Sequence, residues 1–569
     1  MKKIKQISAG LLSLLLLSSC SVPWKSEMSE ENDQVSESSV SESPTDESSV
    51  SKREESGSAV VVEPETAAPT EPEPVEQIDG IPLLSINTVS DDANVLDFVT
   101  ETVNRSVAQS ISSWTPGYKM PPEPYYENCT FSFRGGDGSL LLDNVTGKAK
   151  VRGNWTTSYD KKPLRIKFDE KQSMGGLNGG EQMRNWVLLA EYKDGSLLRN
   201  RTALQISREI LEEDGLYAAD SQLVEVEING IYWGIYLLAD FQQVHENRVD
   251  ITEPEKGYTG LDIGYFLEFD GNFDDEDAQH GFHVDYAGNA ALVPFDGNDG
   301  GGRTMKCLPE GRDWKEDLGV TIKSDIYTDE QHDFIASYVN NVYNIMYYAA
   351  YEDKAYVFDE TCSSIAETDD ITPEQAVEAV VDVQSLADMY IISELTCDAD
   401  IYWSSFFMDV DFGASGDKKL RFEAPWDFDS AMGNKDRCAD GTGLYAANIV
   451  PDVNGGPDGG GTYETINPWL AVLMYEDWYQ EIIAEKWTKI YDSGVFSRAY
   501  DLIASETELY RDGIERNYDK WGNLGSRSAV AGELCSAARS CKTQQEAAEY
   551  LASWLESRVE FLNGVWHEN

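Results

Sequence analysis

Residues 423–434 read EAPWDFDSAMGN, and this stretch decides how the fold is interpreted. Apolar and aromatic residues precede two carboxylates, Asp427 and Asp429, which stand on either side of Phe428. The end of a buried strand does not normally carry two unpaired negative charges, because a bare carboxylate is costly to bury. The stretch therefore predicts a cation bound at a strand end. A structural calcium loop is the alternative interpretation.

The N-terminus predicts an export signal. Lys2, Lys3 and Lys5 precede the apolar run LLSLLLLSSC, which ends at Cys20. This pattern is typical of a secretory signal over residues 1–20. The end of the run resembles a bacterial lipobox, which makes Cys20 the lipidated residue and implies an extracytoplasmic protein held on the cell membrane by lipid. An ordinary cleaved signal peptide is the alternative.

Residues 21–78 predict a disordered tether. Ser, Glu and Pro dominate there, and apolar residues are too few to offset the entropy of ordering. The domain that follows, over residues 79–569, contains frequent aromatic residues and no second linker of this kind. We expect the tether to hold this domain away from the membrane.

The charge of the chain limits its partners. The formal net charge is −57, which disfavours nucleic acid as a partner because phosphate binding needs a basic surface. Cations and basic substrates are favoured, although acidity also serves solubility. Cys535 and Cys541 are the only closely spaced cysteines after Cys20, and a local bridge between them is an open alternative.

The order of the expected elements predicts an α+β fold with two lobes. Strand patterns fill the first half, and Asn229-Gly230 between two of them is a strong hairpin signal. A helix is expected over residues 196–211, because Leu197, Leu204 and Leu211 are seven apart. The second half reads mostly helical, notably over residues 468–491 and 546–562. A strand-rich part followed by a helical part is a natural way to form a cleft.

A basic strand stands out in this acidic chain. Lys162, Arg165 and Lys167 alternate roughly with apolar residues in KKPLRIKF, after Arg152 in the preceding turn. One face is therefore basic while the other faces a core. The face predicts a phosphate or anion site, with an ordinary solvated strand face as the alternative.

A third region, ELTCDADIYWSSFFM, places Asp398 and Asp400 after a helical run and before an aromatic strand. Helix-end turn chemistry is the alternative interpretation. Together the three regions favour phosphoryl transfer, which needs a base for the acceptor hydroxyl, cations on the phosphates, and carboxylates that hold Mg²⁺. A lysine on a strand, a later Asp, and a final Asp beside Phe come in the order that a protein kinase uses.

The chain resembles the CotH family, the spore coat protein H-like atypical protein kinases. The resemblance rests on RGNWTTSYDKKPLRIKF, NWVLLAEYKDGSLLRNRTALQISREI, VEVEINGIYWGIYLLADFQQVHENRVDI, GYFLEFD and PWDFDSAMGN, in that order, and covers roughly residues 80–565. It implies a divergent protein-kinase-like fold with a strand-rich N-lobe and a helical C-lobe. It also implies binding of ATP with Mg²⁺ or Mn²⁺, and a Ser/Thr acceptor on a surface or coat protein.

The resemblance also implies roles for residues. Asp400 would be the catalytic aspartate, with Asp398 in its place if the register shifts by two. Lys167 would be the phosphate-binding lysine. Arg152, Lys162 and Arg165 would contact the cofactor, and Asp427 and Asp429 would bind the metal. The helix over residues 196–211 would be the regulatory helix, with Asp194 or Glu209 as the partner of the lysine. Residues Leu237–Asp240 would form the hinge.

The sequence departs from the kinase pattern in three places. No His-Arg pair precedes Asp400, Ser405 stands where a typical kinase has a metal-binding Asn, and no GxGxxG loop is present. The alternative function is a non-catalytic surface-binding or adhesion module with a structural divalent metal, because acidic loops such as DGNFDDEDAQH would suit Ca²⁺ with oxygen ligands.

Overall fold

A computed structural model describes residues 75–567, except 272, 274–278, 298–301, 307–318, 436–439 and 452–463. The expected signal over residues 1–20, with Cys20, lies outside the described residues, as does the tether apart from residues 75–78. Within the described ranges, no helix combines the length and apolarity needed to cross a membrane.

The first part of the chain forms a closed barrel. Its strand order is β1-β2-β3-β4-β5-β7-β6, in which β1 pairs antiparallel with β2 and closes the barrel through parallel pairing with β6. The strands are β1 (Leu83–Thr88), β2 (Glu127–Arg134), β3 (Leu140–Val151), β4 (Leu164–Gln172), β5 (Met183–Leu189), β6 (Ser221–Ile228) and β7 (Ile231–Ala239). Two helices follow β1: α1 (Asp97–Thr100), whose Phe98 and Val99 pack in the barrel core, and α2 (Arg105–Trp114), whose buried residues form a small separate cluster.

The expected hairpin forms between β6 and β7. Asn229 and Gly230 have φ values of 51° and 73°, so both turn residues adopt the left-handed conformation that a two-residue type I′ turn requires. The expected helix over residues 196–211 is observed as α3 (Arg199–Leu211), which starts three residues later than expected because Leu197 has a left-handed φ of 62°.

Strand β5 is buried on both faces and separates two cores. Trp186 and Leu188 pack inside the barrel, whereas Val187 and Leu189 pack in the larger core that extends into the second part. Strand β4 is different, because Leu164 and the other inward residues pack in the barrel core while its opposite face carries the basic side chains. Those basic side chains share the outer face with Val187.

The second part combines helices with a five-stranded sheet of order β16-β15-β8-β12-β9. The strands are β8 (Gly264–Asp270), β9 (Gly281–His283), β12 (Gly319–Ile322), β15 (Phe406–Asp411) and β16 (Arg421–Glu423). The principal helices are α5 (Asp329–Glu352), α6 (Pro373–Glu378), α7 (Val383–Thr396), α8 (Pro468–Ala471), α9 (Asp477–Asp492), α10 (Val495–Leu509), α11 (Arg511–Trp521), α12 (Ser536–Ser540) and α13 (Gln544–Trp566).

Among the residues that the structure describes, the second part also contains short elements. They include α4 (Tyr286–Asn289), β10 (Ala291–Leu292), β11 (Met305–Lys306), β13 (Ala355–Phe358), β14 (Ile365–Thr368), β17 (Val450–Pro451) and β18 (Glu464–Thr465), together with short 3-10 turns.

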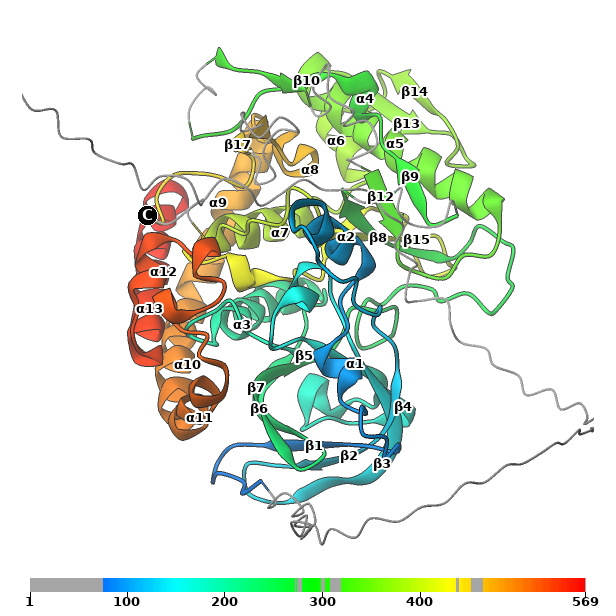
Figure 1. Ribbon diagram of the computed structural model, residues 1–569. Coiled ribbons are helices and arrows are strands. Elements are labelled where there is room, and N and C mark those ends of the chain that lie inside the picture. The colour runs from blue at the N-terminus through cyan, green and yellow to red at the C-terminus, as the bar shows by residue number, and fades with distance from the viewer. Residues whose placement is uncertain are drawn as a thin grey trace, which may run out of the picture.

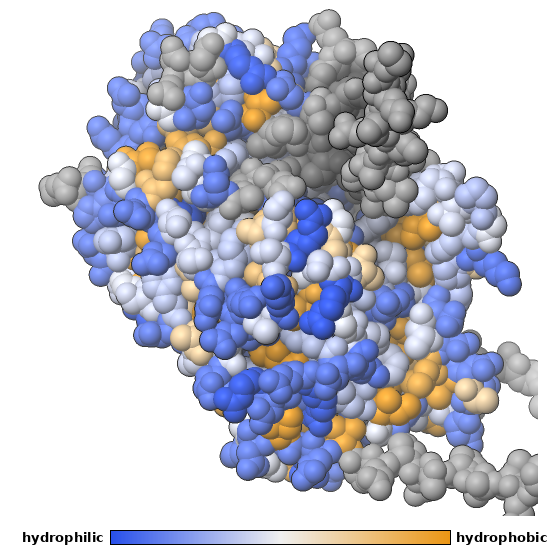
Figure 2. Space-filling view, turned by 60° about the vertical axis from the view of Figure 1, so that its left-hand side comes forward, coloured by the Kyte–Doolittle hydropathy of each residue, from blue (hydrophilic) through white to orange (hydrophobic). Residues whose placement is uncertain are grey.

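The mixed composition confirms the α+β expectation, but the second part is less helical than expected. Strands β8 and β15 are buried along their whole length, so they lack the alternation of polar and apolar residues that marks a half-exposed strand. Figure 1 shows the barrel at one end of the molecule, helices α9 to α13 along one side, and the second sheet at the other end, with α3 between them. On the face in Figure 2 hydrophilic residues predominate, in keeping with the charge of the chain.

Candidate active site

Two loops bring four carboxylates together. Asp427 follows β16 and has a φ of 69°, so the chain turns sharply into the short helix η7 (Phe428–Ser430). Asp398 and Asp400 follow the left-handed end of α7, and the backbone N–H of Asp400 donates to the carboxylate of Asp398 at 3.0 Å. The loops are joined directly, because the N–H of Met432 donates to the Thr396 carbonyl at 2.7 Å.

The carboxylates affect one another strongly. Burial, Asp429 and Asp400 raise the pKa of Asp427 to about 7, against the opposing effect of Lys193 and Arg152. Burial and Asp400 likewise raise the pKa of Asp398 well above its ordinary value. Because neighbouring negative charges disfavour ionisation, a bound cation would stabilise the ionised form of the cluster.

Lys193 supplies positive charge inside the cluster. Its ammonium lies 2.7 Å from the carboxylate of Asp429 and donates to the hydroxyl of Ser430 at 2.6 Å. Burial disfavours the charged form, but Asp429 and other neighbours outweigh burial and raise the pKa of Lys193 well above its ordinary value. Asn434 strengthens the junction, since its side chain donates to the backbone carbonyls of both Lys193 and Asp429.

The sequence interpretation missed Lys193. It lies in the loop between β5 and α3, directly after the buried run NWVLLAEY. The available signal was a lysine flanked by Glu191 and Asp194 in a segment that is otherwise buried.

Arg152 does lie beside the carboxylates. Its guanidinium stacks over the ring of Trp426 at 5.9 Å, and its charge opposes the raised pKa of Asp427. Arg165 is buried, stacks on Phe241 at 4.8 Å, and donates to Asn185 at 3.2 Å. Phe241 directly follows the expected hinge over Leu237–Asp240. The contact between Arg165 and Phe241 therefore places the basic face of β4 next to the segment that leaves the barrel after β7.

Lys162 and Lys167 occupy different environments. Lys162 is buried, donates to the Thr157 carbonyl, and has a pKa lowered to about 8 by burial. Its described contact is therefore within the loop that joins β3 to β4. Lys167 lies in β4, opposite Lys148 and Asn185 in the neighbouring strands.

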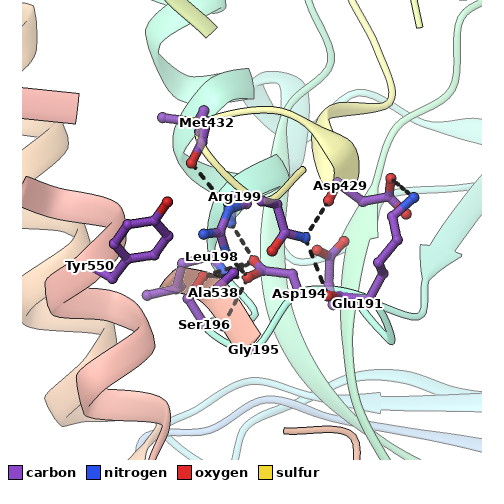
Figure 3. Close-up of polar contacts among 12 residues, drawn as sticks. Glu191, Asp194, Gly195, Ser196, Leu198, Arg199, Asp429, Met432, Ala538 and Tyr550 are labelled. Atoms are coloured by element: carbon purple, nitrogen blue, oxygen red, sulfur yellow. Dashed lines mark hydrogen bonds and ion pairs between the residues drawn. The ribbon is translucent and has the colours of Figure 1, made fainter. Parts of the chain in front are cut away.

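Helix α3 is anchored to the turn that contains Asp427. Asp194 caps the start of α3, accepting from the N–H of Arg199 at 2.8 Å, and forms a buried ion pair with the Arg199 guanidinium. Figure 3 shows Arg199 reaching from Asp194 to the Met432 carbonyl, which accepts from it at 3.4 Å. Glu209, further along α3, pairs with Arg498. Asp194 and Glu209, the two expected partners of the phosphate-binding lysine, therefore each pair with an arginine.

Asn200 forms a second anchor. Its side chain donates to the carboxylate of Glu191 at 3.0 Å and accepts from the N–H of Phe428 at 2.8 Å. All three residues are buried at these contacts. The position of the Asp427 turn is thus coupled directly to the first turns of α3.

The expected hinge lies at the exit from the barrel. Asp240 follows β7, is buried, and has a pKa raised to about 6 by burial despite the nearby Arg248. Its carboxylate accepts from the N–H of Asp220 at 2.8 Å, so it braces the entrance to β6.

Ser405 stands where a typical kinase has a metal-binding Asn. Its backbone N–H donates to the carboxylate of Glu268 at 2.9 Å.

The expected metal ligands are near one another, but they do not enclose a metal by themselves. In the described part of the chain, no group of three or more His, Cys, Asp or Glu side chains has the geometry to hold a metal ion. Mg²⁺ commonly needs only one or two carboxylates, because substrate phosphates and water complete its coordination.

Cys535 and Cys541 are both free, so the local bridge that the sequence left open does not form between them.

Comparison with known proteins identifies the family. No curated protein matches the chain. The family described as CotH kinase protein matches residues 149–562, which include β4, Lys193, both aspartate loops and the C-terminal helices. The chain therefore belongs to the CotH kinase family.

Proposed function

We propose that this protein is an atypical protein kinase that transfers the γ-phosphoryl group of ATP to a Ser or Thr hydroxyl of a surface or coat protein. The observation that carries the proposal is the contact between Lys193 and Asp429, which joins a lysine from the strand-rich part to the carboxylate cluster of the second part. We propose further that these parts are the two lobes of a divergent kinase-like fold.

In this proposal Lys193 takes the role that the family resemblance implied for Lys167. In protein kinases the phosphate-binding lysine is on the strand that precedes the helix supplying its glutamate partner. Here β5 directly precedes α3, and Lys193 lies between them. Arg152, Arg165, Lys162 and Lys167 remain proposed cofactor contacts, and Arg152 is supported by its contact with Trp426, next to Asp427.

The donor set suits a nucleotide with a divalent metal. Asp427 and Asp429 offer the hard oxygen ligands that Mg²⁺ and Mn²⁺ prefer, and their mutual repulsion would be relieved by a cation. When bound, such a metal supplies charge neutralisation on the phosphates. The raised pKa of Asp427 is a property of the metal-free cluster.

Each described residue then has a simple task. Asp400 accepts the proton of the acceptor hydroxyl. The hydroxyl oxygen bonds to the γ-phosphorus as the bond between the γ-phosphorus and the ADP oxygen breaks. Asp398 fixes Asp400, because it accepts from the Asp400 N–H. Lys193 and Arg152 neutralise the phosphate oxygens.

The test is incubation with γ-labelled ATP and Mg²⁺ or Mn²⁺, using the purified protein and a generic Ser/Thr-containing acceptor such as casein. We expect label on the acceptor with the wild type and loss of at least about 100-fold with Asp400→Ala. Equal label in both proteins, or none in either, contradicts the proposal. The non-catalytic module is supported instead if the protein binds a divalent metal but transfers no label.

We also propose lipid anchoring outside the cell membrane through Cys20, with residues 21–78 as the tether. The sequence around Cys20 supports this location. In a bacterial host, Cys20→Ala is expected to abolish lipid labelling of the protein and its recovery in the membrane fraction. Unchanged membrane recovery of the variant would contradict the anchor.

A further inference from the structure

The outer face of β3 and β4 carries basic side chains in opposed pairs. Lys148 of β3 lies opposite Lys167 of β4, and Lys150 lies opposite Arg165. Arg152 follows two positions after Lys150, and alternate residues of a strand share one face. We call these five residues, Lys148, Lys150, Arg152, Arg165 and Lys167, the basic strip. At the rise of a strand, the strip extends about 13 Å along β3.

The register of the basic strip brings like charges together. Like charges that lie directly opposite each other destabilise a sheet, and a bound anion that spans both strands relieves this repulsion. The row through Lys148 and Lys167 continues to Asn128 on β2 and Asn185 on β5, so these four positions hold two amides and no carboxylate. This row therefore offers positive charge and hydrogen-bond donors to an acidic group.

Tyr126 holds the outer end of the strip together. The ammonium groups of Lys148 and Lys150 lie 4.6 and 4.8 Å from the centre of its ring, and both lysines are half-buried. The shared ring attracts both cations and keeps them close to each other. Neither lysine is among the proposed cofactor contacts, so the outer end of the strip is a cationic site beyond them.

The inner end of the strip reaches the candidate active site. The N–H of Arg152 donates to the Pro163 carbonyl at 3.0 Å, so the pairing of the two strands continues to this residue. The Arg152 guanidinium lies over the ring of Trp426, directly before Asp427. Because extended polypeptide rises about 3.3 Å per residue, a segment bound along the strip spans it with about four residues.

We propose that the basic strip binds the acceptor of the transfer reaction, and that this acceptor is an acidic segment with Asp or Glu within about four residues of the phosphorylated Ser or Thr. The inference rests on the proposed function and names its substrate class. Lys148 and Lys150 pair with the acidic residues of the acceptor, and Arg152 stays with the phosphates. The net charge of −57 repels acidic partners elsewhere, so the strip concentrates the positive charge that such an acceptor needs.

The chain itself contains sequence of this chemistry, which supplies the probe. Residues 26–49 hold nine serines and eight Asp or Glu residues, without Lys or Arg. The acidic peptide is a synthetic copy of this sequence. The neutral peptide has Gln in place of every Glu and Asn in place of every Asp, so that it keeps all the acceptor hydroxyls.

The test measures transfer of labelled phosphate from ATP to each peptide by the full-length protein. We expect kcat/KM to be about tenfold higher for the acidic peptide, since two exposed charge pairs each contribute a few-fold in affinity. Lys148→Gln/Lys150→Gln should lose this preference through a higher KM for the acidic peptide. Its transfer to the neutral peptide and its KM for ATP should stay within about twofold of the wild type.

The matched control is Lys489→Gln/Lys542→Gln, which removes the same charge from two exposed lysines of the second part. Loss of the preference in Lys148→Gln/Lys150→Gln but not in this control supports the inference. A folding defect does not mimic this result, because it lowers transfer to both peptides. The comparison of the two peptides with the wild type needs no variant at all.

The other outcomes separate the inference from the proposed function. Equal transfer to the two peptides by the wild type, or a preference that survives in Lys148→Gln/Lys150→Gln, overturns the inference and leaves the proposed function standing. A raised KM for ATP in that variant also overturns the inference, because the outer end of the strip then serves the nucleotide. No transfer to either peptide or to casein overturns the proposed function and the inference together.

Discussion

The ammonium of Lys193 lies 2.7 Å from the carboxylate of Asp429, although the two residues are 236 positions apart in the chain. Lys193 comes from the loop after β5 and Asp429 from the turn after β16, so one ion pair joins the barrel to the second part. Neither side chain is more than 13% exposed. An ion pair with so little solvent depends strongly on both partners.

The first prediction concerns this pair. Lys193→Met should lower phosphate transfer at least about 100-fold, because it removes the charge expected to face the phosphates. It should also destabilise the protein by about 3–5 kcal/mol, because Asp429 is left buried without its partner. Transfer of labelled phosphate and denaturant unfolding measure the two effects.

The double variant Lys193→Met/Asp429→Asn separates the effect on phosphate transfer from the effect on stability. It should recover much of the lost stability, since the uncompensated charge is gone, but none of the transfer. Lys167→Met is the comparison for the phosphate role, and its loss of transfer should be the smaller one. A larger loss in Lys167→Met would return the phosphate-binding role to Lys167.

The second prediction concerns pH and metal binding. The pKa of Asp427 is raised to about 7, and a metal ligand must lose its proton. The affinity for Mn²⁺ with nucleotide should therefore rise about tenfold between pH 6 and pH 8 and then level off. Calorimetric titration at several pH values measures this, and a flat profile would contradict it.

The third prediction follows from the same shift through stability. Because the folded pKa of Asp427 exceeds the unfolded value, the folded protein binds more protons between the two, so its stability falls as pH rises from about 4 to about 7. Asp427→Asn should remove part of this decrease, and should be more stable than the wild type at pH 8 in the absence of metal. Unfolding curves at pH 5 and pH 8 test the sign.

Several of these features could be predicted from the sequence because their signals are local. Asn229-Gly230 predicted the hairpin, and the PWDFD stretch predicted the carboxylate turn. Leu204 and Leu211 lie in α3 as expected, but Leu197 precedes the helix and has a φ of 62°. Each depends on residues within a few turns of one another.

The features that were missed depend on contacts between distant segments. Lys193 lies in a loop, and only the fold brings it to Asp429. The closure of the barrel pairs Leu83 with Glu225, which no local pattern specifies. The expected helical run over residues 468–491 is interrupted between α8 and α9, where Tyr475 donates to the Pro294 carbonyl.

The fourth prediction tests the link between α3 and the carboxylate turn. Asn200→Ala leaves the N–H of Phe428 and the Glu191 carboxylate without their described partner, so it should cost about 1–3 kcal/mol of stability. Gln545→Ala, on the exposed side of α13, is the control and should change little. Equal unfolding midpoints for the two variants would show that Asn200 does not brace the turn.

The fifth prediction separates the two aspartates that follow α7. Asp400→Asn should abolish transfer while nucleotide affinity stays within a few-fold of the wild type, because Asp400 acts on the acceptor. Asp398→Asn should chiefly change stability, since Asp398 is buried and bonded to the Asp400 backbone. The reverse pattern in kcat and stability would assign the base to Asp398.

The central claim is that Lys193 and the two aspartates of the PWDFD turn grip a metal-bound triphosphate. Its most direct test is a crystal structure with Mn²⁺ and a non-hydrolysable ATP analogue, using the anomalous signal of manganese. We predict an anomalous peak within coordinating distance of Asp427 or Asp429 and a phosphate oxygen within hydrogen-bond distance of Lys193. A manganese-bound analogue at another place, with Lys193 still paired only to Asp429, would contradict the account.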